Sequence, residues 1–440
     1  MTNVEIGLVS FPILIALILV RVPIGLAMLM VGFFGTWIVT GSQVPILAQL
    51  KHLPFDTYSN YSLSIVPLFL LMGQFATRGG LSRDLFLASE KMLGHRKGGV
   101  AMAAVGACAA FGSICGSSLA TAATMGQVAL PELRRFGYSG ALATGCLSAG
   151  GTLGILIPPS VILVIYAILT EQNIAKLFIA AFVPGILAAL GYMLTIAIYV
   201  RIFPEAAGLR EPSPFGERCR ALVRVWPVLV IFFLVIGGIY LGWFTPTEGA
   251  AVGAAGTAIV AYVKGGLDWM GLKEAILATA VSTGMIFFIL LGAAVFNGFL
   301  AFSQLPQVAA SAVIDSGLSA WLVLCLMLVR YLIFGCIMES LSMILLTIPI
   351  FFPIIMGLDF GLDPESTALW FGILVLIVVE VGLITPPVGM NLFIINSMAE
   401  SVPISETYRG ALPFILCDFT RVILLVLFPG ITLGLVALLY

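Results

Sequence analysis

Strongly apolar runs, separated by short polar segments, fill almost the whole chain. They are 5–20, 22–39, 61–77, 138–169, 176–200, 226–244, 246–263, 276–300, 367–398 and 411–438. Two further apolar segments, 99–130 and 319–356, carry polar interruptions near their middles. A helix needs about 20 mostly apolar residues to cross a bilayer. The pattern therefore predicts an all-α polytopic membrane protein with about ten spans.

One pattern of interruptions occurs twice, once in each half of the chain. Residues 111–118 are FGSICGSS and are followed at 154–159 by GILIPP. Residues 334–342 are FGCIMESLS and are followed at 382–387 by GLITPP. Broken backbone inside a bilayer is tolerated only where it is buried in protein or lines a cavity. Paired breaks in corresponding positions of two halves indicate the binding site of a secondary transporter.

Composition supports a membrane transporter and argues against other classes. Hydrophobic residues make up 61% of the chain and charged residues only 9%, against about 25% charged residues in a soluble domain. The net charge of −1 gives no electrostatic basis for nucleic-acid binding. The 7 scattered cysteines and 2 histidines form no metal-ligand spacing, so neither a zinc site nor an organic cofactor is expected. An intramembrane enzyme would need a nucleophile–base pair or clustered carboxylates, and the sequence suggests neither.

Lysine and arginine orient the spans, because they gather in cytoplasmic loops. The basic cluster at 78–97 shares a side with Arg134 and Arg135 only if segment 99–130 enters the membrane and returns as a hairpin. Continuing the count places Lys264 and Lys273 in the cytoplasm as well. The same holds for the arginines of the 201–225 loop, which are Arg201, Arg210, Arg218, Arg220 and Arg224.

The second half repeats this layout in the opposite orientation. Segment 319–356 is followed by the acidic loop 359–365, which has no basic residue and suits the periplasm. It is therefore predicted to be a second hairpin, entering from the other face. Each half then holds five spans and one hairpin, an inverted-topology repeat with both termini periplasmic.

Three shorter segments are mixed in polarity. Residues 40–60 and 264–275 precede the third span of each half and are predicted to be interfacial arm helices. Residues 81–97 are predicted to form an amphipathic helix on the cytoplasmic side.

The interruptions supply two kinds of chemistry. Unwound backbone exposes carbonyl oxygens beside hydroxyl groups, and both are suitable ligands for Na⁺. Half-helix N-termini point N–H groups inward, which suits a carboxylate. The predicted Na⁺ ligands are Ser113, Gly116, Ser117, Gly151, Thr152, Gly335, Glu339, Ser342, Thr385 and Gly389. The predicted substrate-binding residues are Ser117, Ser118, Thr121, Gly151, Thr152, Ser340, Thr385, Pro386, Asn391 and Arg330.

These residues also have a structural interpretation. Small residues in membrane helices often serve close packing, but two copies, each with a downstream Pro-Pro break, favour a site. Charges within apolar segments are costly and mark functional candidates, among them Glu380 just before the second break. Arg330 suits either a structural ion pair or a substrate contact. Asp418 and Arg421 stand three residues apart, a spacing that favours a local pair.

At these motifs the chain resembles a known family, the large membrane subunits (DctM type) of tripartite ATP-independent periplasmic (TRAP) transporters. The similarity rests on VPLFLLMGQFA at 66–76, FGSICGSSLATAATMGQVALPELRRFGYS at 111–139, AGGTLGILIPPS at 149–160, FTPTEGAA at 244–251 and GLITPPVGMNLF at 382–393. The likeness covers nearly the whole chain.

The resemblance implies a bacterial inner-membrane importer of the elevator type. A Na⁺ gradient would drive uptake of a small organic acid, such as a C4-dicarboxylate. It implies two protein partners, a periplasmic substrate-binding protein and a four-span small membrane subunit. Because no further spans precede the first one, the small subunit is expected to be a separate polypeptide.

An elevator mechanism divides the chain into a mobile transport domain and a scaffold. The transport domain would comprise 78–170, with hairpin 99–130 and broken span 138–169, and 301–398, with hairpin 319–356 and broken span 367–398. The scaffold would comprise 1–77 with the first arm helix, 171–300 with the second, and the last span in 399–440. The alternative is a stand-alone Na⁺/dicarboxylate carrier without a binding protein, against which the SICGSSLATAAT block and the TPTEG motif argue.

Overall fold

The computed structural model describes residues 1–208 and 211–440. Within these ranges the chain forms α-helices and short 3₁₀ or π-helical turns and no β-strand, so the all-α prediction is confirmed. Arg210, assigned from the sequence to the 201–225 loop, lies outside the described residues.

The helices follow one another through short connections. In the first half they are α1 (Asn3–Leu19), α2 (Ile24–Thr40), α3 (Val44–Tyr58), the 3₁₀ turn η1 (Tyr61–Ser64), α4 (Ile65–Arg78), α5 (Leu81–Leu93), α6 (Gly99–Cys115), α7 (Ser118–Arg135), α8 (Gly140–Leu156), α9 (Val161–Thr170), α10 (Ile174–Ile202) and η2 (Pro204–Ala206). In the second half they are α11 (Phe215–Phe232), the π-helical turn η3 (Phe233–Gly237), α12 (Gly238–Tyr240), α13 (Pro246–Val263), α14 (Trp269–Ser303), α15 (Leu305–Asp315), α16 (Ala320–Gly335), α17 (Ser340–Met356), α18 (Pro364–Gly382), α19 (Met390–Met398), α20 (Ile404–Leu427) and α21 (Gly430–Leu439).

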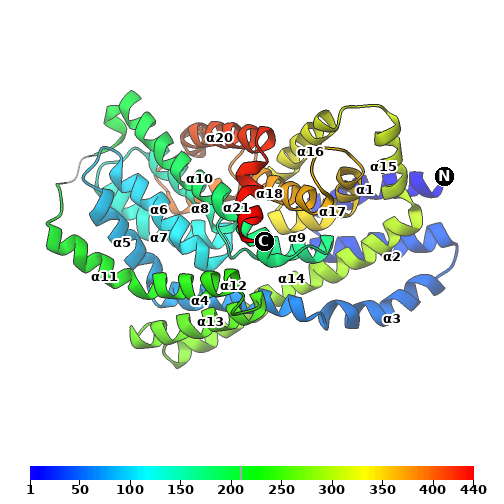
Figure 1. The fold of residues 1–440 in the computed structure, drawn as a ribbon, viewed down its shortest axis with the longest axis horizontal. Helices are drawn as coiled ribbons and strands as arrows, with labels where there is room; N and C mark the ends of the chain where they lie inside the picture. Colours follow the sequence, from blue (N-terminus) through cyan, green and yellow to red (C-terminus); the bar gives the residue numbers. More distant parts are fainter. Residues whose placement is uncertain (209–210) are drawn as a thin grey trace.

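Two groups of helices flank a shared centre. Helices α6, α7 and α8 pack together, as do α16, α17 and α18, and Figure 1 shows the groups on opposite sides of the molecule. They meet where α19 packs on α7 and α8, and where α9 packs on α17 and α18. Long helices line one edge in pairs, α14 beside α2 and α13 beside α4 (Figure 1). The first break, at residues 157–160, therefore lies in the interior, while the second reaches the surface at Pro386 and Pro387.

Small residues allow helices α2 and α14 to pack closely. A Cβ added at Gly32 of α2 would lie 2.8 Å from Cα of Phe296 on α14. A Cβ at Gly25 would lie 3.0 Å from Cα of Ile289 on the same helix. Since close backbone approach is how membrane helices gain packing energy without a hydrophobic driving force, glycine is needed along this face of α2.

Within the described residues, five helices qualify as membrane spans by length and composition: α10, the continuous run Phe215–Tyr240, α14, α18 and α20. The pair α8 and α9, bent by 44° at a short break, makes a sixth if it is one span. Several shorter helices are apolar too, including α1, α2, α6, α16, α17 and α21. The chain is thus a multi-helix membrane protein, and the full count of ten spans stays a prediction.

The two predicted arm helices turn out differently. Residues 44–58 form a separate helix, α3, as expected for the first arm. The separate second arm at 264–275 is wrong, because residues from Trp269 onward belong to the continuous 35-residue helix α14. Asp268 caps this helix, its Oδ1 accepting from the N–H of Gly271 at 2.6 Å. No proline follows before Ser303, so nothing ends the helix at residue 275.

Two other segments refine the sequence analysis. The run 411–438 is not one uninterrupted helix, because Phe428 and Pro429 separate α20 from α21. The amphipathic segment 81–97 does form a helix, α5, which buries Leu81, Leu85 and Phe86. That buried face packs on α6, the first helix of the first hairpin.

Candidate functional site

The first hairpin turns at two residues between α6 and α7. Gly116 ends α6 with a φ of +64°, a left-handed conformation that glycine adopts without strain. Ser117 caps α7, its Oγ accepting a hydrogen bond from the N–H of Ala120 at 3.4 Å. A Cβ added at Gly116 would lie 3.1 Å from the carbonyl oxygen of Pro159. The turn therefore lies directly against the first Pro-Pro break.

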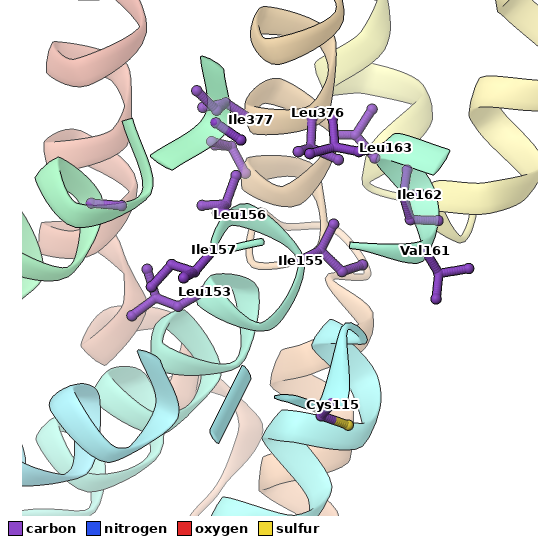
Figure 2. Packing of buried hydrophobic residues seen from close by; sticks show 14 of the residues in the cluster. Cys115, Leu153, Ile155, Leu156, Ile157, Val161, Ile162, Leu163, Leu376 and Ile377 are labelled. Atoms are coloured by element: carbon purple, nitrogen blue, oxygen red, sulfur yellow. The ribbon is translucent and has the colours of Figure 1, made fainter. Parts of the chain in front are cut away.

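The first break separates α8 from α9 at residues 157–160. Ser160 restarts the helix, its Oγ accepting from the N–H of Leu163 at 3.4 Å. Figure 2 shows apolar side chains crowding both sides of the break, with Leu163 beside Leu376 of α18. The unwound backbone is thus enclosed by protein, the condition under which a break is tolerated in a bilayer.

Glycines bring each hairpin into backbone contact with its broken helix. A Cβ at Gly112 of α6 would lie 2.5 Å from Cα of Gly154 on α8. A Cβ at Gly382 of α18 would lie 2.6 Å from Cα of Gly335 on α16. No side chain fits at either crossing, so these four glycines fix how closely hairpin and broken helix approach. Gly335 has this packing role, and its predicted role as a Na⁺ ligand stays a prediction.

The second hairpin turns at residues 336–339 between α16 and α17. Glu339 occupies the N-cap of α17, with extended backbone and no side-chain cap hydrogen bond within the described chain. Gly389, with a φ of +66°, donates its N–H to the carbonyl oxygen of Cys336 at 3.2 Å. The second hairpin thus lies against the second break, as the first hairpin does against the first.

A buried carboxyl group connects the tips of the two hairpins. Glu380 of α18 is 0% exposed, and its Oε1 accepts a hydrogen bond from Oγ of Ser340, the first residue of α17, at 2.8 Å. The side chain of Ser118, the first residue of α7, lies near the same carboxyl group but makes no hydrogen bond to it within the described residues. The other oxygen, Oε2, has no good hydrogen-bond partner in the described part of the chain. The starts of both return helices therefore meet at one acid.

A second buried polar chain begins at Thr152, just ahead of the first break. Its Oγ1 lies 3.1 Å from the hydroxyl of Tyr192 on α10. That hydroxyl donates to Oδ2 of Asp418 on α20 at 2.7 Å. Oδ1 of Asp418 lies 2.8 Å from Nη2 of Arg421, so the predicted local pair is confirmed. Tyr192 was missed because an aromatic residue within an apolar run is usually a core residue.

Asn391 of α19 connects the second half to α8. Its Nδ2 donates to the carbonyl oxygen of Ser148 at 3.3 Å, while its Oδ1 has no partner among the described residues. A Cβ at Gly151 would lie 3.2 Å from this Nδ2. Asn391 and Gly151, both predicted site residues, are thus brought together from different halves.

The predicted hydroxyl groups fall into two kinds. Those of Thr121 and Ser342 are fully buried and lack hydrogen-bond partners in the part of the chain that the structure describes. Those of Ser113 and Thr385 donate to carbonyl oxygens one turn earlier, at 2.8 Å and 2.6 Å. Thr121 and Ser342 therefore each offer a buried hydroxyl group that could take a ligand.

Arg330 and Pro386 do not join this buried arrangement. Arg330 is exposed on α16, on the face that carries the exposed Leu326 and Ile333, and its guanidinium lies over the ring of Phe334 at 5.7 Å from the centroid. The helical period turns residue 330 away from the break, so the substrate contact of Arg330 stays a prediction that this buried arrangement does not include. Pro386 is likewise exposed, at the surface of the second break.

Within residues 1–208 and 211–440, no group of three or more His, Cys, Asp or Glu side chains gathers to hold a metal. A cation bound at the hairpin tips would therefore depend on carbonyl and hydroxyl oxygens, with at most one or two carboxylates. This donor set suits a monovalent hard cation better than a transition metal.

Paired hairpins and broken helices that enclose polar groups in an apolar, multi-helix chain define a membrane transport protein. The chain belongs to the family described as tripartite ATP-independent periplasmic transporter, DctM component, which it matches over residues 11–431.

Individual relatives agree with this family. The chain is 40% identical over 382 residues to a C4-dicarboxylate TRAP transporter large permease protein DctM of Pseudomonas aeruginosa, covering 87% of each chain. It is 30% identical over 374 residues to the sialic acid TRAP transporter permease protein SiaT of Haemophilus influenzae, covering 84% of this chain and 59% of that one. Among solved structures, the YdaH transporter of Alcanivorax borkumensis has a TM-score of 0.65 at 15% identity, over 87% of this chain and 89% of that one, and so shares the fold.

Proposed function

We propose that this protein is the large membrane subunit of a Na⁺-coupled TRAP importer for a small organic acid, working by an elevator movement in the bacterial inner membrane. The observation that carries the proposal is the family match over residues 11–431. The meeting of both hairpin tips at Glu380 adds a structural reason, because it gives a single enclosed site.

Reciprocal packing supports an inverted repeat of ten spans and two hairpins. Helix α9 packs on α17, and α19 packs on α7; likewise α10 packs on α18, and α20 packs on α8. In each of these two pairs of contacts, replacing both helices by their counterparts in the other half turns one contact into the other. A pseudo-twofold axis in the membrane plane gives this arrangement.

Contacts at the hairpin bases support segments that enter the membrane and return. The N–H of Val100, at the start of α6, donates to the hydroxyl of Tyr138, just after α7, at 3.1 Å. The rings of Trp321, at the start of α16, and Phe360, just after α17, lie 5.5 Å apart. Each hairpin therefore begins and ends at the same place.

Ion pairs support the proposed orientation, with both termini in the periplasm. Three pairs join segments assigned to the cytoplasm: Arg78 with Glu274 at 2.9 Å, Lys91 with Glu217, and Lys264 with Asp84. A fourth, Lys176 with Glu365 at 2.6 Å, joins two residues assigned to the periplasm. No pair in the described chain links the two sides, which agrees with the sidedness inferred from lysine and arginine.

Na⁺ would bind at each hairpin tip and order the broken backbone. The unpartnered buried hydroxyls of Thr121 and Ser342, one in each half, support this assignment. The substrate would be a carboxylate held by the N-terminal N–H groups of α7 and α17. Two relatives are named for C4-dicarboxylate and for sialic acid, both of which carry a carboxylate, so the carboxylate class is proposed rather than one acid.

The elevator would move residues 78–170 and 301–398 against the remaining helices. The α2–α14 and α4–α13 pairs are suited to a static scaffold, because glycine-mediated contact fixes them closely. A separate four-span small subunit would widen this scaffold, and a periplasmic binding protein would deliver the acid on the outer face.

Uptake into proteoliposomes that contain this chain and its small subunit tests the proposal. A panel of labelled organic acids is supplied with and without an inward Na⁺ gradient, and with and without the cognate binding protein. Uptake that requires both supports the tripartite importer and identifies the acid. Uptake with Na⁺ alone would indicate a stand-alone carrier, and no uptake under any condition would overturn the proposal.

A further inference from the structure

We propose that Glu380 is a proton-binding site that couples proton movement to the transport cycle. The inference rests on the proposed function and adds a second coupling ion to it. Its structural basis is the position of one buried carboxyl group between the tips of both hairpins.

The Glu380 carboxyl group lacks a positive partner. It is 0% exposed, its neighbours Val379, Val381 and Leu383 are fully or almost fully buried, and no ion pair of Glu380 exists within the described residues. An ionised carboxylate in apolar surroundings is so costly that such a group takes up a proton instead. Ionisable residues inside a membrane are functional candidates for this reason.

The charged groups nearest Glu380 include no free cation within the described residues. Asp418 of α20 and Glu339 at the start of α17 interact with it as like charges. Arg421, the cation on α20, is already paired with Asp418. From α10 and α9, the hydroxyls of Tyr192 and Tyr166 donate elsewhere, to Asp418 and to the carbonyl oxygen of Ala368.

Other titratable side chains on α16 and at the start of α18 have contacts of their own or lie at the surface. On α16, Arg330 is exposed and the hydroxyl of Tyr331 accepts a hydrogen bond from Thr347. At the start of α18, Glu365 pairs with Lys176.

One oxygen of the carboxyl group is left for a proton. Oε1 accepts from Ser340, which leaves Oε2 without a good partner in the described chain. A proton taken from water by Oε2 forms a carboxylic acid, and we expect its O–H to donate to the hydroxyl of the nearby Ser118 as the tips close. The protonated acid would then hold one serine from each hairpin tip, and release of the proton to water would loosen that link.

A proton fits this position better than a metal cation does. Na⁺ needs a shell of several oxygens, whereas one serine hydroxyl is hydrogen-bonded to this side chain and its chain neighbours are apolar. One acceptor hydroxyl is enough for a proton. Proton loading would therefore be linked to closure of both tips, while Na⁺ binding at carbonyl and hydroxyl groups remains a separate step.

Infrared spectroscopy tests proton binding directly, with the proton itself as the probe. The complex in membranes is compared at acidic and alkaline pH, for the natural chain and for Glu380→Gln. We expect a carboxylic-acid C=O band that disappears on raising the pH and is lost in Glu380→Gln. A natural chain without such a band, or a band that persists unchanged in the variant, would overturn the inference.

Proton flux in proteoliposomes tests the coupling. Vesicles loaded with a pH-sensitive dye take up succinate, or whichever acid of the panel is transported, under a Na⁺ gradient. We expect internal acidification coupled to uptake, lost in Glu380→Gln. It should be retained in Glu365→Gln, a matched variant of the exposed glutamate at the start of the same helix.

The two assays separate failure of this inference from failure of the proposed function. Na⁺-driven uptake without acidification would remove the proton coupling and leave the importer intact. Acidification that persists in Glu380→Gln would mean that the proton travels on another group or on the substrate, and would also overturn the inference. Absence of any uptake would count against the proposed function, while the infrared band still decides whether Glu380 binds a proton.

Discussion

Both broken helices contact their hairpins through a glycine, but the polar side chain two residues before that glycine differs in charge. Thr152 stands two residues before Gly154, and Glu380 stands two residues before Gly382, the glycines that touch their hairpins. In the first half, the hydroxyl of Thr152 is hydrogen-bonded to Tyr192, and Tyr192 is hydrogen-bonded to Asp418 of the Asp418–Arg421 pair. In the second half the side chain is an acid without a cation. The halves therefore share a structural frame, and their functional difference lies in the side chains placed on it.

The largest expected effect comes from the acid that has a counter-ion. Asp418→Asn leaves Arg421 buried without a negative partner, so it should lower the free energy of unfolding by about 3–5 kcal/mol. Glu380→Gln replaces an unpaired acid by a neutral group of similar shape and should cost less than about 1 kcal/mol. Thermal unfolding of the purified complex in detergent measures both.

A double variant provides the control for this comparison. Asp418→Asn combined with Arg421→Met removes both charges and should recover most of the lost stability. Equal destabilisation by Asp418→Asn and Glu380→Gln would show that the two acids do not differ as the structure indicates.

The glycine crossings should respond next most strongly, and equally in both halves. An added Cβ at Gly154 would lie 2.7 Å from the carbonyl oxygen of Ser117, and one at Gly382 would meet Gly335. Alanine at either position should cost about 1–3 kcal/mol through overpacking and reduce uptake. Gly284→Ala, where nothing lies within 4 Å, is the matched control and should be neutral or slightly stabilising. A clear difference between Gly154→Ala and Gly382→Ala would contradict the equivalence of the two crossings.

The N-caps of the two broken helices should differ only in their response to pH. Ser139 caps α8, accepting from the N–H of Leu142 at 3.3 Å, and Asp363 caps α18, accepting from the N–H of Ser366 at 2.9 Å. Replacing either by alanine should cost about 1 kcal/mol at neutral pH. Hydrogen bonds from Ser366 hold the pKa of Asp363 below its usual range.

The sign of this pH effect follows from linkage. Because the folded-state pKa of Asp363 is lowered, its cap is fully stabilising above the unfolded-state pKa and is lost as the pH falls through the folded-state pKa. The melting-temperature gap between the natural chain and Asp363→Ala should therefore shrink in acid, whereas the gap for Ser139→Ala should stay constant. Parallel behaviour of both gaps would show that the Asp363 carboxylate is not the cap.

The smallest effect is expected outside the compared regions, at Arg330. Within the described residues, its exposed guanidinium lies over the ring of Phe334. Arg330→Ala should therefore change the free energy of unfolding by no more than about 0.5 kcal/mol. The KM for uptake should also stay unchanged. A large rise in KM would show that Arg330 contacts the substrate.

Local features of this fold could be predicted because their causes are local. The glycines and prolines of the breaks end helices wherever they stand, and Asp418 and Arg421 pair because three residues bring them to one helix face. The failed second arm shows the limit of such reasoning. Mixed polarity at 264–275 suggested a separate element, but the capped helix simply continues into α14 because no breaker intervenes.

By itself, the sequence determined that the chain lies in a membrane, that it carries two hairpins and two breaks, and which polar residues stand at them. Only the tertiary structure decided which of these meet. Ser118 and Ser340 converge on Glu380, Tyr192 joins Thr152 to Asp418, and Arg330 faces outward. The physical reason is that helix-breaking propensity acts within a few residues, whereas contacts between helices depend on packing across hundreds of residues of chain, which no local pattern records.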